Sequence, residues 1–211
     1  MASFGLPPVF YEVVFLSIKI FIDQGHNPSN HNQGAAANGL FESDINYNVG
    51  IYLRDLLNAD GRFTARTSRN TPTEVLGWDD SSSLQVRVNM ANIWSADYFL
   101  SIHGNANLNP NIHGSEMYIY GVQGQAFPLA QNIMRGITER VNTRDNGIRL
   151  NQEFYVLRRT SMPAVLVELA YLTNVGDAEL LRCCQYGFAR GIYDGLLSYF
   201  GLLPPKLLNM Q

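Results

Sequence analysis

The sequence stretches that decide the fold are KIFID at residues 19–23, YFLSIH at 98–103 and AVLVE at 164–168. Each is a short apolar run that ends in a polar or charged residue and is bounded by loop-forming residues, a pattern typical of buried strands. Segments with helical spacing separate these runs. Strands that alternate with helices predict an α/β domain built around a largely parallel sheet.

The rest of the chain fits the same scheme. Further strands are expected at 63–66, 115–120 and 153–158, and an exposed loop at 67–83. Helices are expected where apolar residues recur from Ile45 to Leu57 before Gly61, and at 84–96, 127–141, 177–181 and 186–200. We therefore predict a mostly parallel, twisted sheet of about six strands with helices on both faces.

Composition limits the class of protein. The chain has 211 residues, about the length of one domain. Its net charge is −3, and no run of Lys or Arg forms a basic patch, so we expect no nucleic-acid partner. The two cysteines, Cys183 and Cys184, are adjacent, which suits neither an ordinary disulfide nor a zinc knuckle.

The two ends of the chain differ from its middle. The apolar stretch at 9–22 is interrupted by Glu12 and Lys19 and is shorter than a membrane span, while residues 1–8 lack the positive charge of a signal peptide. We expect an N-terminal extension at 1–18, one folded domain at 19–202 and a C-terminal tail at 203–211. No transmembrane segment is expected.

Candidate site residues stand where strands end or helices begin. His26 follows the first strand, His103 ends the central one, and Glu42 lies in the first turn of a helix. Each alone is consistent with an ordinary loop histidine or a charge that favours a helix start. Glu168 differs, because a carboxylate after Ala-Val-Leu-Val bears a large desolvation cost unless a cation or a proton offsets it.

Taken together, these residues indicate a metal. Two imidazoles and one carboxylate are a common ligand set of catalytic zinc, with water in the fourth position, and the absence of nearby thiolates argues against a structural site. The spacing does not form a compact HExxH helix, so the pattern alone leaves the assignment open. Glu168 is available as a second carboxylate for proton transfer.

A resemblance narrows these choices. The chain resembles the zinc-dependent N-acetylmuramoyl-L-alanine amidases of the type called amidase 3, found in bacterial cell-wall amidases and phage lysins. The blocks that carry it, in the family's order, are IDQGH (22–26), NGLFESDIN (38–46), SIHGN (101–105) and PAVLVE (163–168), with LQVRVNMAN (84–92), HGSE (113–116) and FYVLR (154–158) between them.

The resemblance implies one zinc ion per chain, held by His26, Glu42 and His103, and a catalytic Glu168 that moves protons during hydrolysis. It implies that the substrate is the amide between the muramic acid lactyl group and L-alanine in peptidoglycan. An extracellular or cell-wall location, a secreted autolysin-like role and a monomeric state follow as expectations. The family commonly has Pro at Gln24 and Gly at Asn27; neither position is a ligand.

Other roles remain open. Asp23 and Asn105 could orient the imidazoles or cap loops, and Asn105 and Arg158 could contact the substrate. Arg158 could equally be a solvated charge. His31 and His113 lie in polar loops and are expected to have no specific role. Alternative functions are a zinc peptidase that cuts another peptidoglycan amide, or a non-catalytic wall-binding module.

Overall fold

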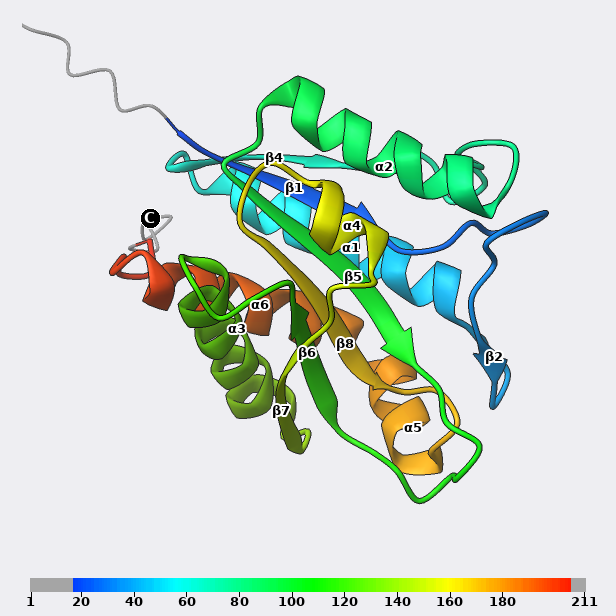
Figure 1. Ribbon diagram of the computed structural model, residues 1–211. Coiled ribbons are helices and arrows are strands. Elements are labelled where there is room, and N and C mark those ends of the chain that lie inside the picture. The colour runs from blue at the N-terminus through cyan, green and yellow to red at the C-terminus, as the bar shows by residue number, and fades with distance from the viewer. Residues whose placement is uncertain (1–16, 206–211) are drawn as a thin grey trace, which may run out of the picture.

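The computed structural model describes residues 17–205, which form an α/β sandwich (Figure 1). The predicted extension at 1–18 and tail at 203–211 therefore lie largely outside the described residues. The strands are β1 (Ile18–Gln24), β2 (Ala36–Ala37), β3 (Leu40–Phe41), β4 (Phe63–Thr67), β5 (Tyr98–Asn105), β6 (Ser115–Ile119), β7 (Asp145–Leu150) and β8 (Ala164–Tyr171). The helices are α1 (Glu42–Ala59), α2 (Asp80–Trp94), α3 (Ala126–Val141), α4 (Tyr155–Arg159), α5 (Val175–Cys183) and α6 (Gln185–Tyr199).

The main sheet has six strands in the order β4-β1-β5-β8-β6-β7. Every neighbouring pair is parallel except β6 and β8, which are antiparallel. The predicted mostly parallel α/β sheet is thus confirmed. The chain runs from β1 to β4 on one side and then returns to β5 on the other, so the strand order reverses between β1 and β5. Ligand sites of open α/β sheets lie outside the carboxyl ends of the strands at such a reversal.

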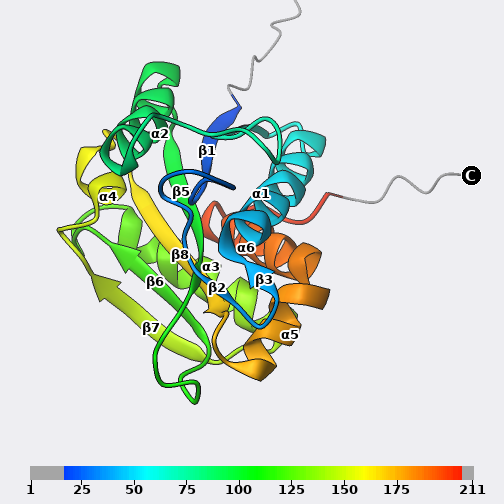
Figure 2. The same cartoon turned by 90° about the vertical axis from the view of Figure 1, so that its right-hand side faces the viewer.

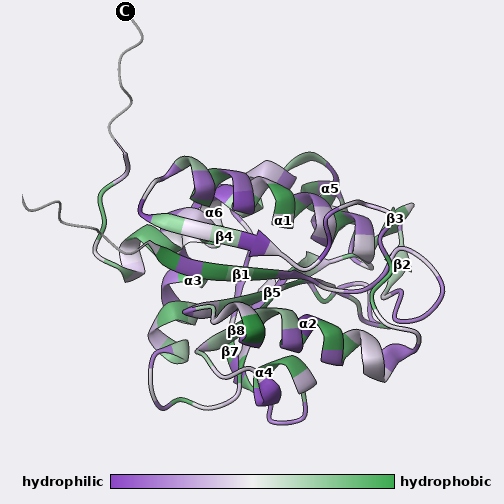
Figure 3. Ribbon diagram, turned by 90° about the horizontal axis from the view of Figure 1, so that it is seen from above, coloured by the Kyte–Doolittle hydropathy of each residue, from purple (hydrophilic) through white to green (hydrophobic). Residues whose placement is uncertain are grey.

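Helices cover both faces of the sheet, as the view from above shows (Figure 3). One face carries Ile22, Leu100 and Val167, which pack in one apolar cluster with residues of α1, α3, α5 and α6. The other carries Phe21, Phe99 and Leu166, which pack with α2 and α4. Because successive strand residues point to opposite faces, each apolar run supplies both cores. Among residues 17–205, no helix combines the length and the apolar character that a membrane crossing requires.

Two sequence predictions were wrong. Residues 153–158 are not a strand: residues 155–158 belong to the short helix α4, whose Val156 and Leu157 are buried against α2 and the sheet. The sixth strand is instead β7, which escaped prediction because DNGIRL lacks apolar alternation and sits at the edge of the sheet.

The segment at 67–83, expected to be an exposed loop, also differs. Ser68, Arg69 and Leu76 are buried in it. In addition, α2 begins at Asp80, earlier than expected, because the Asp79 side chain accepts a hydrogen bond from the Ser82 backbone N–H in a capping box. The segment runs from the end of β4 to α2 (Figure 2), and the Asn27 side chain in the loop after β1 bonds both backbone groups of Leu76, while residues 70–73 and 78–81 are exposed.

Candidate metal centre

The strand registers place polar side chains side by side on the face that α2 and α4 cover. Asp23 pairs with Ser101 between β1 and β5, and His103 pairs with Glu168 between β5 and β8. The residues two positions before Asp23, Ser101 and Glu168 are Phe21, Phe99 and Leu166, which pack in the apolar cluster on this face. Alternation along adjacent parallel strands thus assembles the floor of a site.

Glu42 reaches this floor from a separate element. Asn38 and Gly39, both with positive φ (51° and 72°), form the turn of the β2–β3 hairpin, an Asn-Gly sequence suited to tight hairpins. The chain then enters α1, whose first residue is Glu42. The Glu42 carboxylate is buried and accepts backbone N–H bonds from Ala35 (2.8 Å, to Oε2) and Gly104 (3.2 Å, to Oε1). Its position is therefore fixed by backbone on both sides.

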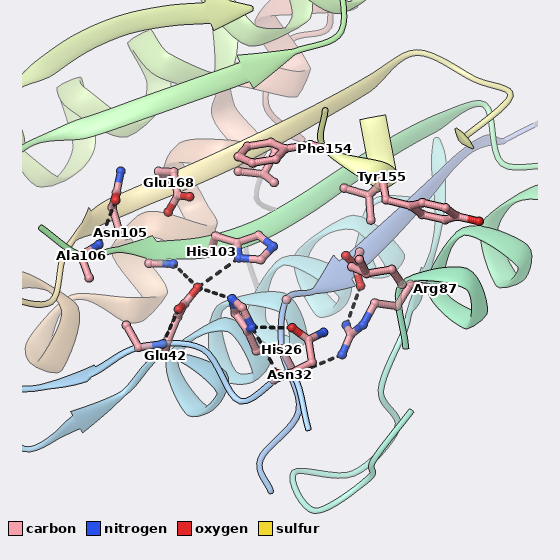
Figure 4. Close-up of a pocket in the computed structure, with 17 residues that line it drawn as sticks. His26, Asn32, Glu42, Arg87, His103, Asn105, Ala106, Phe154, Tyr155 and Glu168 are labelled. Atoms are coloured by element: carbon pink, nitrogen blue, oxygen red, sulfur yellow. Dashed lines mark hydrogen bonds and ion pairs between the residues drawn. The ribbon is translucent and has the colours of Figure 1, made fainter. Parts of the chain in front are cut away.

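His26, Glu42 and His103, which the sequence predicted as ligands, converge on one point (Figure 4). Oε1 of Glu42 lies 3.1 Å from Nε2 of His26 and 3.0 Å from Nδ1 of His103. One possible ligand atom from each residue lies within 4.8 Å of the others. The imidazoles meet edge to face at a ring angle of 83°.

The outer hydrogen bonds of the imidazoles select their tautomers. Nδ1 of His26 faces two acceptors of Asn32, the backbone O (3.2 Å) and Oδ1 (3.0 Å), so it must carry a hydrogen. Ser101 donates its hydroxyl hydrogen to Oδ2 of Asp23 (2.8 Å), which leaves the Ser101 oxygen to accept from Nε2 of His103 (3.1 Å). The inward nitrogens, Nε2 of His26 and Nδ1 of His103, then each present a lone pair.

Two lone pairs and a carboxylate oxygen directed at one point repel one another unless a positive charge lies between them. A second proton on each imidazole can supply that charge: burial opposes the charge of Glu42, but hydrogen bonds and charge from protonated His103 and His26 then outweigh burial and hold the pKa of Glu42 well below its ordinary value of 4.5. Burial likewise lowers the pKa of His26, but Glu42 outweighs it and raises that pKa. This donor set of two imidazole nitrogens and one carboxylate oxygen fits Zn²⁺.

Glu168 lines the same cavity as His26, Glu42 and His103, and its side chain forms no hydrogen bond or ion pair with residues 17–205. Its Oε2 atom is buried and has no hydrogen-bond partner among residues 17–205. Burial, reinforced by the negative charges of Glu42 and Glu116, raises the pKa of Glu168 well above its ordinary value. Buried polar atoms are rarely left unpaired, so this atom is directed at something other than protein.

A buried ion pair supports the loop that carries His26. Arg87 of α2 donates to Asp23 Oδ1 (2.7 Å), to the backbone O of Gln24 (2.6 Å) and to the backbone O of His26 (2.6 Å). Burial raises the pKa of Asp23, but the charge and hydrogen bonds of Arg87 outweigh burial, so that pKa is lowered. His26 itself has a left-handed backbone (φ 68°), a conformation that needs such support.

The remaining candidates are placed differently. Asn105 lines the cavity, and its Nδ2 lies 3.5 Å from Glu116 Oε2 rather than against an imidazole. Arg158 is exposed on α4 and does not line the cavity, so its contact with substrate stays a prediction without support from this geometry. Asp23 does not touch His103 directly: it accepts a hydrogen bond from the Ser101 hydroxyl, and the Ser101 oxygen in turn bonds Nε2 of His103. His31 bonds the Leu76 carbonyl (3.2 Å) and has a structural contact.

Sequence reasoning missed Arg87, Asn32 and Ser101. For two of them, position in the sequence could have suggested a role. Ser101 stands two residues before His103 and so lies on the same face of the strand, and Arg87 lies within LQVRVNMAN (84–92), a block that carries the family resemblance. Nothing in the sequence shows that Arg87 spans the gap between α2 and the end of β1. That contact depends on how the helix packs on the sheet.

The side chains of His26, Glu42 and His103 line a cavity of about 330 Å³, within the range of small-ligand sites. Phe154 and Tyr155, at the start of α4, form an apolar wall opposite the polar floor (Figure 4). A three-ligand cluster beside a separate buried carboxylate, in a cleft at a strand-order reversal, is the arrangement of metal-dependent hydrolases.

Comparison with known proteins identifies the family. Residues 20–198 match the family model described as N-acetylmuramoyl-L-alanine amidase, and the chain belongs to this family of enzymes. It is 39% identical over 186 residues to the N-acetylmuramoyl-L-alanine amidase LytC of Bacillus subtilis, covering 86% of this chain and 35% of that protein. It is 40% identical over 189 residues to the N-acetylmuramoyl-L-alanine amidase CwlM of Bacillus licheniformis, covering 88% of this chain and 70% of that protein.

A solved structure agrees with the fold. The N-acetylmuramoyl-L-alanine amidase from Clostridium difficile 630 superposes with a TM-score of 0.77 at 31% identity, over 88% of this chain and 97% of that one. The resemblance to this family expected from the sequence is confirmed. The chain spans only about a third of the length of LytC.

Proposed function

We propose that this domain hydrolyses the amide between the lactyl group of N-acetylmuramic acid and L-alanine of the stem peptide in peptidoglycan, with zinc as its cofactor. The family membership supports the choice of bond. The observation that carries the zinc assignment is the convergence of His26 Nε2, His103 Nδ1 and the Glu42 carboxylate, with imidazole tautomers set to offer lone pairs inward.

In this proposal His26, Glu42 and His103 hold one zinc ion. When bound, zinc supplies Lewis acidity, which acidifies water and polarises the scissile carbonyl. Asn32 and Ser101 keep the inward nitrogens unprotonated, and the short backbone bonds to Glu42 keep the carboxylate in place.

Glu168 has the role of proton carrier. Its carboxylate, which lines the cavity, accepts the proton of the attacking water and later delivers it to the alanine nitrogen as the amide breaks. A raised pKa suits both steps, because the carboxyl group holds the proton long enough to pass it on. Phe154 and Tyr155 give the cavity an aromatic side next to these groups.

The proposed site of action follows from the substrate. Peptidoglycan lies outside the cytoplasmic membrane, so we propose action at the cell wall.

The test is product analysis. Zinc-loaded protein is incubated with purified peptidoglycan, and the products are identified by mass spectrometry. We expect intact stem peptides with a free L-alanine amine and intact glycan strands. Cleavage within the stem peptide, with the lactyl amide uncut, would instead establish a peptidase; no cleavage would establish a non-catalytic module.

A substitution tests the proton carrier separately. Glu168→Gln preserves shape but cannot carry the proton, so we expect the rate to fall by about 10²–10⁴-fold while zinc content stays the same. Turnover close to wild type by this variant would remove Glu168 from the mechanism.

A further inference from the structure

A second polar cavity adjoins the metal centre. It has a volume of about 470 Å³ and is bordered by β6, by β7 and by the loop after β5. Asn105 lines both this cavity and the one around the metal ligands, so the two are neighbours. We call the second cavity the polar groove; its charged lining residues are Glu116, Arg144 and Arg149.

The floor of the polar groove is directly beside Glu168. Glu116 on β6 is the register partner of Glu168 on β8, and alternation places both on the same face of the sheet. A substrate that occupies both cavities would therefore have its cleaved bond near Glu168 and its continuation over Glu116.

Buried contacts hold Arg149 at the mouth of the groove. Glu116 is only 3% exposed, and its carboxylate accepts hydrogen bonds from the hydroxyls of Tyr171 (2.6 Å) and Tyr118 (2.8 Å). It also accepts from Nη2 of Arg149 (3.0 Å), whose side chain is 54% exposed. One edge of the guanidinium is thus fixed, and the rest is open to a ligand. A guanidinium held in this way is suited to a carboxylate.

Arg144 adds a second positive charge. It is exposed, and it forms no ion pair within residues 17–205. Its backbone is anchored, because its carbonyl accepts the Ser115 N–H (2.8 Å). Among the lining residues, the one carboxylate, Glu116, is already balanced by Arg149, so Arg144 leaves the groove with an excess positive charge that favours an anionic ligand.

We propose that the polar groove binds the stem peptide, with Arg144 and Arg149 receiving the carboxylate of its second residue. This inference rests on the proposed function, which makes an L-alanine-terminated peptide the leaving group at Glu168. A carboxylate at that residue would bind the two guanidinium groups, whereas its uncharged amide would not pair with their charge. The groove therefore distinguishes these two forms of the substrate.

The experiment compares two soluble muropeptides that differ only at the second stem residue, D-glutamate or its α-amide. Kinetics are measured for zinc-loaded wild type, Arg144→Gln, Arg149→Gln and the matched control Arg135→Gln, an exposed arginine of α3 on the opposite face. We expect wild type and control to show a KM about three- to tenfold lower for the acidic form. Arg144→Gln and Arg149→Gln should lose that preference with kcat little changed.

The outcomes separate the two proposals. If wild type cleaves both forms with equal KM, or if both arginine variants keep the preference, the groove assignment is overturned while the proposed function stands. Arg149→Gln leaves the buried carboxylate of Glu116 without its ion-pair partner, so this variant is also expected to be less stable. Arg144 is exposed and has no such partner, so Arg144→Gln tests the groove without this loss of stability.

If wild type cleaves neither form, the proposed function fails, and direct titration with the dipeptide L-alanyl-D-glutamate decides the groove. Calorimetric binding to wild type that weakens about three- to tenfold in Arg144→Gln supports the groove assignment. No binding, equal binding by wild type and variant, or binding of a peptide-free saccharide that depends on Arg144 would overturn it.

Discussion

Replacement of Arg87 by methionine tests how the fold supports the metal centre. Arg87 and Asp23 are each 1% exposed and form an ion pair of 2.7 Å. The same guanidinium holds the carbonyls of Gln24 and His26 at 2.6 Å each. Methionine approximately fills the volume but removes every one of these donors, so Asp23 keeps a buried charge without its partner.

The magnitude follows from that unpaired charge. Breaking a buried ion pair by removal of one partner costs about 3–5 kcal/mol, because the remaining charge stays desolvated. For a domain of this size, 1 kcal/mol shifts Tm by about 2–4 °C, so Arg87→Met should lower Tm by about 6–20 °C. Loss of the anchor on the His26 carbonyl should also weaken zinc binding about 10- to 100-fold.

The assay is thermal and urea unfolding of the apoprotein, followed by circular dichroism, with zinc affinity measured by competition against a chelator. The double variant Asp23→Leu/Arg87→Met is the control, because it removes both charges and should be more stable than Arg87→Met alone. A single variant within about 1 kcal/mol of wild type, or a double variant no more stable than the single one, would refute the reasoning.

Three further predictions follow from the same geometry. Gly25→Ala should weaken zinc binding about 10-fold or more, because a Cβ there would lie 2.3 Å from Cε1 of the His103 ring; Gly61→Ala, where a Cβ meets nothing within 4 Å, is the matched control and should bind normally. Zinc at about 100 times its Kd should stabilise the wild type by about 2.7 kcal/mol, a Tm rise of about 5–11 °C in calorimetry, and Glu42→Gln should abolish most of that rise. The folded-state pKa of Asp23 is lowered below its ordinary value of 3.8, so its stabilising effect is complete above that pH and is lost as pH falls through the folded-state pKa. The stability difference between wild type and Asp23→Asn, from urea unfolding, should therefore be constant from about pH 5 upward and narrow below pH 3.8; a difference that narrows near neutrality would contradict it.

Much of the fold was predictable because buried parallel strands carry a strong local pattern. KIFID, YFLSIH and AVLVE each supply residues to both cores, so their composition reveals burial on two faces. Three of the candidate site residues were predictable for a related reason: His26, His103 and Glu168 follow or end these strands, and parallel strands bring their carboxyl ends to one edge.

The rest depends on contacts that the local pattern does not encode. β7 is an edge strand in which no residue is buried, so no alternation of buried and exposed residues marks it. Residues 154–157 combine aromatic and branched side chains that favour strands, but packing against α2 and the sheet makes them helical. From the sequence alone, Arg87 would be predicted to be a charge on the exposed side of a helix. It is buried because α2 packs on the sheet with this side chain facing inward.

The central claim is most directly tested by locating the metal. Crystals of zinc-loaded protein, with data collected on both sides of the zinc absorption edge, give an anomalous difference map specific for zinc. We predict one peak per chain within about 2.0–2.3 Å of Nε2 of His26, Nδ1 of His103 and a carboxylate oxygen of Glu42. A peak elsewhere, or no peak in protein that retains zinc in solution, would contradict the account.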